Sequence, residues 1–132
     1  MKKILKTVLF TVPFFILSGC GEAGISTESK NSTFANQQRS DNQKAANQGD
    51  ALAQFNMGVM YYEGQGVNKN YVLARQWYEK AANQGRAAAQ AALGWMYFQG
   101  EGVIRDREKG CALWRMSADE RADYLYKSNC NP

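Results

Sequence analysis

The chain has 132 residues, enough for one modest domain, with 16 Lys and Arg against 12 Asp and Glu and a formal net charge of +4. It contains no histidine, which excludes Ser-His-Asp and Cys-His catalytic machinery and leaves no ligand set that suits zinc. The composition therefore argues against an enzyme of these classes, and we expect neither a cofactor nor a metal.

Residues 1–19 have the pattern of a targeting segment. Lysines at the N-terminus precede an apolar run, Thr7 to Leu17, which is about half as long as a membrane-spanning helix requires. The run leads directly into Leu17-Ser18-Gly19-Cys20, which resembles the lipobox of bacterial lipoproteins. The resemblance implies that residues 1–19 are a lipoprotein signal peptide and that Cys20 is lipidated and anchors the protein to a membrane. An ordinary secretory signal that contains a cysteine is the alternative.

Removal of this segment would change the charge balance. It takes away three of the 16 basic residues and no acidic one, so 13 remain against 12 acidic residues, a net charge near +1. No cluster of Lys and Arg with interleaved aromatic residues remains, and we therefore expect no nucleic-acid partner. The lipoprotein resemblance also implies a location in the bacterial cell envelope. Gly21 stands where Asp commonly signals inner-membrane retention in enteric bacteria, which favours the outer membrane, facing the periplasm.

Residues 20–43 consist mostly of Gly, Ser, Thr, Asn, Gln and scattered charged residues, with Ile25 and Phe34 as the large apolar exceptions. Such a segment buries too little apolar surface to offset its chain entropy. The sequence therefore predicts a lipidated cysteine with a flexible tether over 20–43 and a folded domain over 44–132.

The folded region contains an internal repeat. AANQGDALAQFNMGVMYYEGQGV, which begins at Ala45, is closely matched by AANQGRAAAQAALGWMYFQGEGV, which begins at Ala81, an offset of 36 residues. A period in this range is typical of stacked helical hairpins. We therefore predict an all-α fold, a short α-solenoid with repeats at about 45–80 and 81–116.

Each repeat is predicted to contain two helices, over 50–63 and 71–82 in the first and over 86–99 and 107–118 in the second. Gly64 and Gly66, which recur in the second repeat, follow the first helix, and Asn70 and Asp106 stand at N-cap positions. A phosphate-binding loop is the alternative for the paired glycines. Their repetition, without a third glycine or a preceding strand, favours a role in ending the helices.

Four residues are predicted to shape the core of the hairpins. Trp77 and Trp114 occupy apolar faces of the second helices and are expected to pack between hairpins. Gly58 and Gly94 lie inside first helices, where glycine costs about 1 kcal/mol relative to alanine. We expect close helix approach at these two glycines.

The phrases AQFNMGVMYYEGQGV, ARQWYEKAANQG and AQAALGWMYFQGEGV resemble Sel1-like repeats, relatives of the tetratricopeptide repeat. The resemblance covers Ala45 to about Ala118 and implies a protein-interaction scaffold that binds an unidentified protein or peptide. Some disulfide-rich Sel1-like proteins are associated with β-lactam binding and hydrolysis, so such an enzyme is the alternative. The S-x-x-K signature and the closely spaced cysteine pair of that group are absent here, and we therefore expect no enzyme. Homo-oligomerisation through the solenoid stays open.

Residues 117–132 begin like a third repeat and are predicted to form a capping helix. Counting nine residues back from Glu120, in the expected turn, reaches Cys111, and counting ten forward reaches Cys130. Two antiparallel helices would bring these positions to the same level, so we predict a disulfide between them. A redox-active pair is the alternative, but neither a CxxC motif nor an activating neighbour is present.

The first helices are expected to line the concave side of the solenoid. Side chains there that differ between the repeats, Ala92 among them, are candidates for contact with a partner, since aromatic residues dominate interface hot spots. The alternative for Trp95 and Phe98 is packing between the hairpins. The predicted partner-binding residues are Asn56, Val59, Tyr62, Glu63, Trp95, Phe98 and Gln99.

Overall fold

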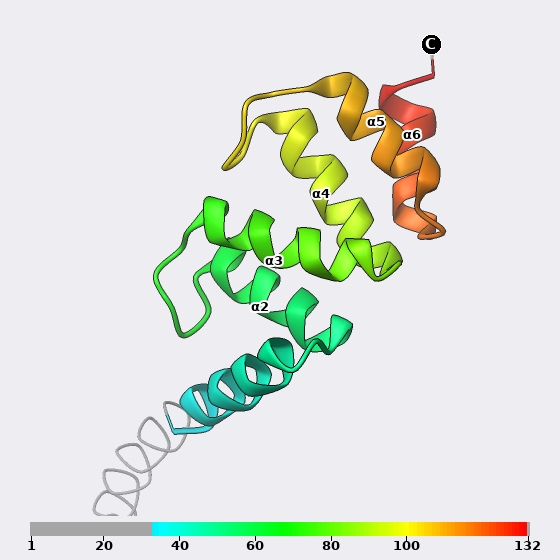
Figure 1. Cartoon of the computed structure of the whole chain (residues 1–132). Coiled ribbons are helices and arrows are strands. Elements are labelled where there is room, and N and C mark those ends of the chain that lie inside the picture. Colours follow the sequence, from blue (N-terminus) through cyan, green and yellow to red (C-terminus); the bar gives the residue numbers. More distant parts are fainter. Residues whose placement is uncertain (1–32, 132) are drawn as a thin grey trace, which may run out of the picture. The chain divides into compact units, whose positions relative to one another are not determined.

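The structure is a computed structural model that describes residues 33–131, and all secondary structure in this range is helical (Figure 1). Residues 33–47 are helical and are followed by α2 (Ala51–Glu63), α3 (Tyr71–Asn83), α4 (Ala87–Gln99), α5 (Arg107–Met116) and α6 (Glu120–Asn129). The predicted all-α class is confirmed. The predicted signal peptide, Cys20 and the first part of the tether lie outside the described residues.

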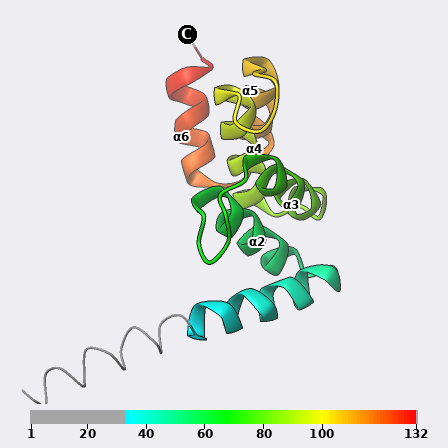
Figure 2. The same cartoon turned by 90° about the vertical axis from the view of Figure 1, so that its left-hand side faces the viewer.

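The chain divides between Gln37 and Gln38, and α2 to α6 all belong to the second part. Within that part α2 and α3 form one antiparallel hairpin and α4 and α5 a second, while α6 lies beside α5 and α4 (Figures 1 and 2). Each helix packs chiefly on its neighbours in sequence, as in other solenoids of helical hairpins. No helix within residues 33–131 is long and apolar enough to cross a membrane.

The helix over residues 33–47 begins inside the segment predicted to be a tether. Residues 44–49, KAANQG, repeat residues 80–85, which end α3, so this helix resembles the second helix of a hairpin. Its C-terminal end is packed: Ala46 is buried against Ala53 and Met57, and its carbonyl accepts a hydrogen bond from Gln54 Nε2 at 3.2 Å. Ala46 lies within the predicted folded range, and the helix that contains it extends into residues that were predicted to be a flexible tether.

Side-chain caps begin most of the helices, as predicted for Asn70 and Asp106. Asn70 Oδ1 accepts from the backbone N–H of Leu73 at 3.0 Å, and Asp106 Oδ1 accepts from that of Lys109 at 2.9 Å. Asp50 caps α2 in the same way, whereas the equivalent Arg86 makes no capping hydrogen bond.

Glycines end the first helix of each repeat. Gly64 and Gly100 adopt left-handed conformations, with φ of 74° and 83°, and their N–H groups bond to the carbonyls of Met60 and Met96. This conformation costs glycine little because it has no Cβ. The interpretation of these glycines as helix ends is confirmed.

The glycines inside the first helices allow large side chains to approach the backbone, as predicted. A Cβ built on Gly94 would lie 2.5 Å from Cδ1 and Nε1 of Trp114, and one built on Gly58 would lie 2.5 Å from Cε1 of Tyr78. Trp114 is fully buried, and its Nε1 donates a hydrogen bond to the carbonyl of Ala91 at 3.0 Å. Each repeat thus fits an aromatic ring of its second helix onto a glycine of its first helix.

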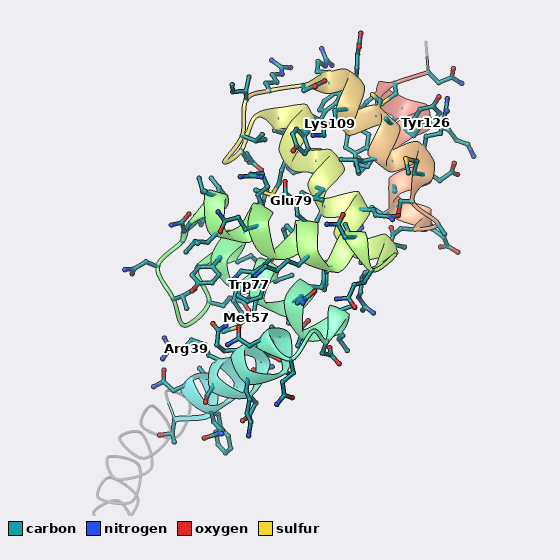
Figure 3. All side chains as sticks on the ribbon, viewed as in Figure 1. Arg39, Met57, Trp77, Glu79, Lys109 and Tyr126 are labelled. Atoms are coloured by element: carbon teal, nitrogen blue, oxygen red, sulfur yellow. A yellow bond between two sulfur atoms is a disulfide. The ribbon has the colours of Figure 1, made fainter. Side chains whose placement is uncertain are left out.

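The two tryptophans predicted for the core differ in their surroundings. Trp114 is at 0% exposure, which confirms that it is a core residue, but its contacts with Gly94 and Ala91 lie within its own hairpin rather than between hairpins. Trp77 is half-buried at the edge of the cluster that contains Met57, and Lys80 Nζ lies 4.0 Å from its ring centroid (Figure 3). The two tryptophans differ because they are not equivalent in the 36-residue repeat. Tyr78, one residue after Trp77, is the equivalent of Trp114, and it is buried against Gly58 in the first repeat.

The predicted disulfide joins Cys111 of α5 to Cys130, the residue that follows α6, with the Cα atoms 5.7 Å apart. Both cysteines pack against the cluster around Trp114 and Phe98. The disulfide therefore connects the C-terminal helix to the second repeat, as the sequence predicts.

Candidate partner-binding groove

A groove of about 1010 Å³ runs across the first helices of the repeats. Its walls come from α2, α4 and the start of α6, together with Tyr78 of α3. The repeat explains this arrangement, since α6 aligns with α2 and α4 as a third first helix. The apolar part of the lining consists of Phe55, Val59, Tyr62, Ala92, Trp95 and Leu125, with Tyr78 and small alanines.

The aromatic residues of the groove are held in place by rings beneath them. The centroids of Phe55 and Tyr78 are 5.6 Å apart, and those of Trp95 and Trp114 are 6.4 Å apart. Tyr78 is buried and Phe55 and Trp95 are half-buried, so each ring has one packed side. This support keeps an apolar surface ordered, which lowers the entropy lost when a partner binds.

Tyr62 links the two repeats at one end of the groove. Its Oη donates a hydrogen bond to Glu101 Oε2 at 2.7 Å, and its ring centroid is 5.1 Å from that of Tyr71. Burial and then the hydrogen bond to Glu101 raise the pKa of Tyr62 above its ordinary value, although Trp95 acts in the opposite direction. The phenol therefore stays protonated at neutral pH and acts as a hydrogen-bond donor.

Tyr78, deeper in the groove, is protonated for a similar reason. Burial is the main cause that raises its pKa, with added contributions from Tyr62 and the negative charge of Glu63. These two tyrosines supply the groove with neutral hydroxyl groups rather than with nucleophiles.

The structure brings most of the predicted partner-binding residues together. Val59, Tyr62, Glu63 and Trp95, with Ala92, all line the groove. Asn56 and Gln99 are not part of its lining.

Phe98 requires a correction, because it is only 7% exposed and is not available to a partner. Its ring centroid lies 5.0 Å from that of Trp114, and Arg107 Cζ lies over the Phe98 ring at 4.5 Å from the centroid. Phe98 thus packs within the second repeat, against Trp114 of the same hairpin, whereas the alternative for this residue was packing between the hairpins.

The sequence prediction did not include Phe55, Tyr78 or the wall contributed by α6. Phe55 aligns with Ala91, so it differs between the repeats in the way used to select the other residues, and that difference could have identified it. Alignment of residues 117–132 with a first helix could likewise have placed the start of α6 on the concave side. Tyr78 lies on a second helix and has no comparable signal.

The charged residues of the groove lie at its two ends. Glu63, at the end of α2, is exposed, and its carboxylate accepts a hydrogen bond from the side chain of Gln65. Asp119, Glu120 and Arg121 lie at the start of α6, where the Asp119 carboxylate accepts the N–H groups of Arg121 and Ala122. No group of three Cys, Asp or Glu side chains in residues 33–131 is arranged to hold a metal ion. Apolar side chains along the groove, with charged side chains at its ends, are suited to binding an amphipathic segment.

Comparison with known proteins places these features in a family. The family model described as the Sel1 repeat matches residues 51–85 and 87–121, and each match covers one hairpin and the turn that follows it. No curated protein matches the sequence of this chain.

Solved structures with the same fold come from several bacteria. The chain is 38% identical to a Sel1 repeat protein from Oxalobacter formigenes, with a TM-score of 0.64 over 66% of this chain and 26% of that one. It is 32% identical to a protective antigen of uropathogenic Escherichia coli that displays an SLR fold, with a TM-score of 0.61 over 70% of this chain and 21% of that one. The chain thus spans about a quarter or less of the length of these two proteins.

Cysteine rich protein B of Helicobacter pylori shares the fold at 21% identity, with a TM-score of 0.62 over 66% of this chain and 68% of that one. Sel1 repeats generally mediate protein–protein interaction and serve as non-catalytic scaffolds. Two matched repeats, the solenoid of helical hairpins and these structural neighbours lead to one conclusion: the chain belongs to the Sel1 repeat family.

Proposed function

We propose that this protein is a lipid-anchored scaffold of the bacterial cell envelope, and that its groove binds a segment of another protein without chemical change. The observation that carries the proposal is the groove lined by ordered aromatic side chains, of which Tyr62 and Trp95 are half-buried and reachable. Aromatic residues that are supported from below and open above have the properties of interface hot spots. The interaction role of Sel1 repeats supports the same assignment.

The envelope part of the proposal is supported chiefly by the sequence. A basic start, an apolar run too short to span a bilayer and Leu17-Ser18-Gly19-Cys20 follow one another in the order of a lipoprotein signal. The pairing of Cys111 with Cys130 is also compatible with an oxidising compartment outside the cytoplasm. We propose the outer membrane, facing the periplasm, as the location.

Site-specific photocrosslinking in intact cells tests the groove. A photoreactive amino acid replaces Glu63, at the rim of the groove, and in a matched variant it replaces Glu108, an exposed residue of α5 outside the groove lining. We expect a discrete protein adduct from position 63, lost when Trp95→Ala is added, and none from position 108. Adducts of equal yield from both positions, or an adduct at 63 that survives Trp95→Ala, would contradict binding in the groove.

Lipid anchoring has a separate test. Cys20→Ser should abolish incorporation of labelled palmitate and release the protein from the membrane fraction, since one lipidated cysteine is the proposed attachment. Cys111→Ser, which keeps Cys20, is the control and should remain labelled. Palmitate labelling that persists in Cys20→Ser would disprove this part of the proposal.

A further inference from the structure

The groove is more acidic than the rest of the described chain. Residues 33–131 contain twelve Lys and Arg against ten Asp and Glu, a net charge of +2. The groove lining instead carries three carboxylates, Glu63, Asp119 and Glu120, against a single guanidinium, that of Arg121. Next to the lining, Glu101 accepts the hydrogen bond of Tyr62, and a second guanidinium, that of Arg86, lies 5.6 Å from the ring centroid of Phe55, so carboxylates still outnumber guanidinium groups. The concave surface thus opposes the net charge of the folded domain, and this favours a cationic ligand.

Residues 33–131 contain eleven aromatic residues besides Tyr62 and Trp95. Cations lie over the rings of five of them: Lys69 over Tyr71, Lys80 over Trp77, Arg86 over Phe55, Arg107 over Phe98 and Lys109 over Tyr97, at 4.0 to 5.8 Å from the ring centroids. Figure 3 shows Lys109 on α5 and Trp77 on α3. Such cation–π contacts are favourable, most of all with tryptophan.

Tyr62 and Trp95 are the two groove aromatics proposed above to contact the partner. Neither has such a cation over its ring among residues 33–131. Both are half-buried and line the groove, and Glu63, which also lines it, follows Tyr62 directly in α2. An aromatic face near a carboxylate offers a Lys or Arg side chain two favourable contacts. The alkyl chain or the guanidinium plane packs on the ring, and the positive charge interacts with the carboxylate.

We infer that the partner segment is basic and amphipathic: a Lys or Arg side chain lies on Trp95 and Tyr62 with its charge toward Glu63, and an adjacent apolar side chain contacts Val59 and Leu125. This inference rests on the proposed function, because it specifies the chemistry of the segment that the groove binds. The carboxylate of Glu120 at the far end of the groove accommodates a second basic residue, beside Arg121.

The test is binding of defined peptides to the full-length protein in a neutral detergent, measured by calorimetry. The probes are three peptides of equal length with the same leucines, in which the intervening residues are arginine, glutamine or glutamate. We expect the arginine peptide to bind at least tenfold more tightly than the glutamate peptide, with an affinity that falls as salt increases. Glu63→Gln should weaken the arginine peptide roughly two- to fivefold and leave the glutamine peptide unchanged.

Two further variants complete the design. Glu108→Gln removes an exposed carboxylate outside the groove lining and should not change the affinity for any of the peptides. Trp95→Phe keeps an aromatic side chain, but a phenyl ring attracts a cation less strongly than an indole does. The variant should therefore weaken binding of the arginine peptide more than binding of the glutamine peptide.

The outcomes separate this inference from the proposed function. Equal affinities for the three peptides, with all binding abolished by Trp95→Ala, would overturn the inference that the partner is basic. The groove would still be the binding site. Tighter binding of the glutamate peptide, or no binding of the arginine peptide while position 63 still forms its crosslink, would also overturn the inference alone. Tight binding of the arginine peptide that is unaffected by Trp95→Ala would reject both.

Discussion

Removal of the disulfide between Cys111 and Cys130 should lower the free energy of unfolding by about 3 kcal/mol. The two cysteines are 19 residues apart in sequence, and closing a loop of this size in the unfolded chain corresponds to a loss of chain entropy worth about 3 kcal/mol at room temperature. For a small domain whose total stability is on the order of 5 to 15 kcal/mol, this is a large share.

The structure shows why α6 depends on this covalent link. Ala122 is the only residue of α6 that is buried, and Leu125 and Tyr126 are half-buried against the cluster around Trp114. Little apolar contact therefore holds the helix, although its first turn forms one end of the groove. Without the disulfide we expect α6 to open locally, and the groove to lose that wall.

The assay is urea unfolding followed by circular dichroism, with wild type compared with the variant Cys111→Ser, Cys130→Ser. A loss of about 3 kcal/mol moves the midpoint down by on the order of 1 to 3 M urea. Hydrogen exchange of the α6 amides in the absence of urea should become faster in the variant, while that of the buried residues of α2 and α4 changes less.

Reducing agent supplies the control for this prediction. It should destabilise wild type to the level of the double variant and leave the variant unchanged. A midpoint that moves by less than about 0.5 M urea on reduction of wild type would refute the loop-entropy argument. Equal acceleration of exchange in α2 and α6 would refute the local opening of α6.

Three other predictions follow from the core and the groove. Gly94→Ala should destabilise the fold by about 1 to 2 kcal/mol in urea unfolding, because the overpacking cost against Trp114 exceeds the gain in helix propensity of about 1 kcal/mol. Stability should fall as pH rises above the ordinary tyrosine pKa of 10.0, by up to about 1.4 kcal/mol per pH unit for Tyr78, since the unfolded chain releases the phenol proton that the folded state retains. Nitrocefin should not be hydrolysed above the buffer rate, because Tyr62 and Tyr78 are protonated phenols in the groove rather than nucleophiles.

Each of these predictions has a matched control. An increase in stability on Gly94→Ala would show that Trp114 moves aside at little cost. Tyr78→Phe removes one ionisable group and should reduce the decline in stability above pH 10.0, to which Tyr62 also contributes, so an unchanged decline would assign it to other groups. An authentic β-lactamase validates the nitrocefin assay, and turnover that survives Trp95→Ala but scales with protein concentration would revive the enzyme alternative at another site.

Local features of the fold could be predicted from the sequence because they depend on neighbouring residues. The period of 36, from Ala45 to Ala81, fixes the hairpin unit, and Gly64 and Asn70 mark where helices end and begin through backbone conformation and capping. The pairing of Cys111 with Cys130 could be predicted for a similar reason, since equal distances along two antiparallel helices require only the position of the turn.

The division of aromatic residues between core and groove was decided only by the tertiary structure. Phe98 and Trp95 lie three residues apart on one helix, yet Phe98 is buried and Trp95 lines the groove. The physical reason lies in α5: Gly110 and Gly94 let the backbones approach closely enough for Trp114 to pack over α4, and Phe98 packs against that ring. Helical periodicity predicts which residues share a face, but the angle and distance of the neighbouring helices determine which part of that face stays open to a partner.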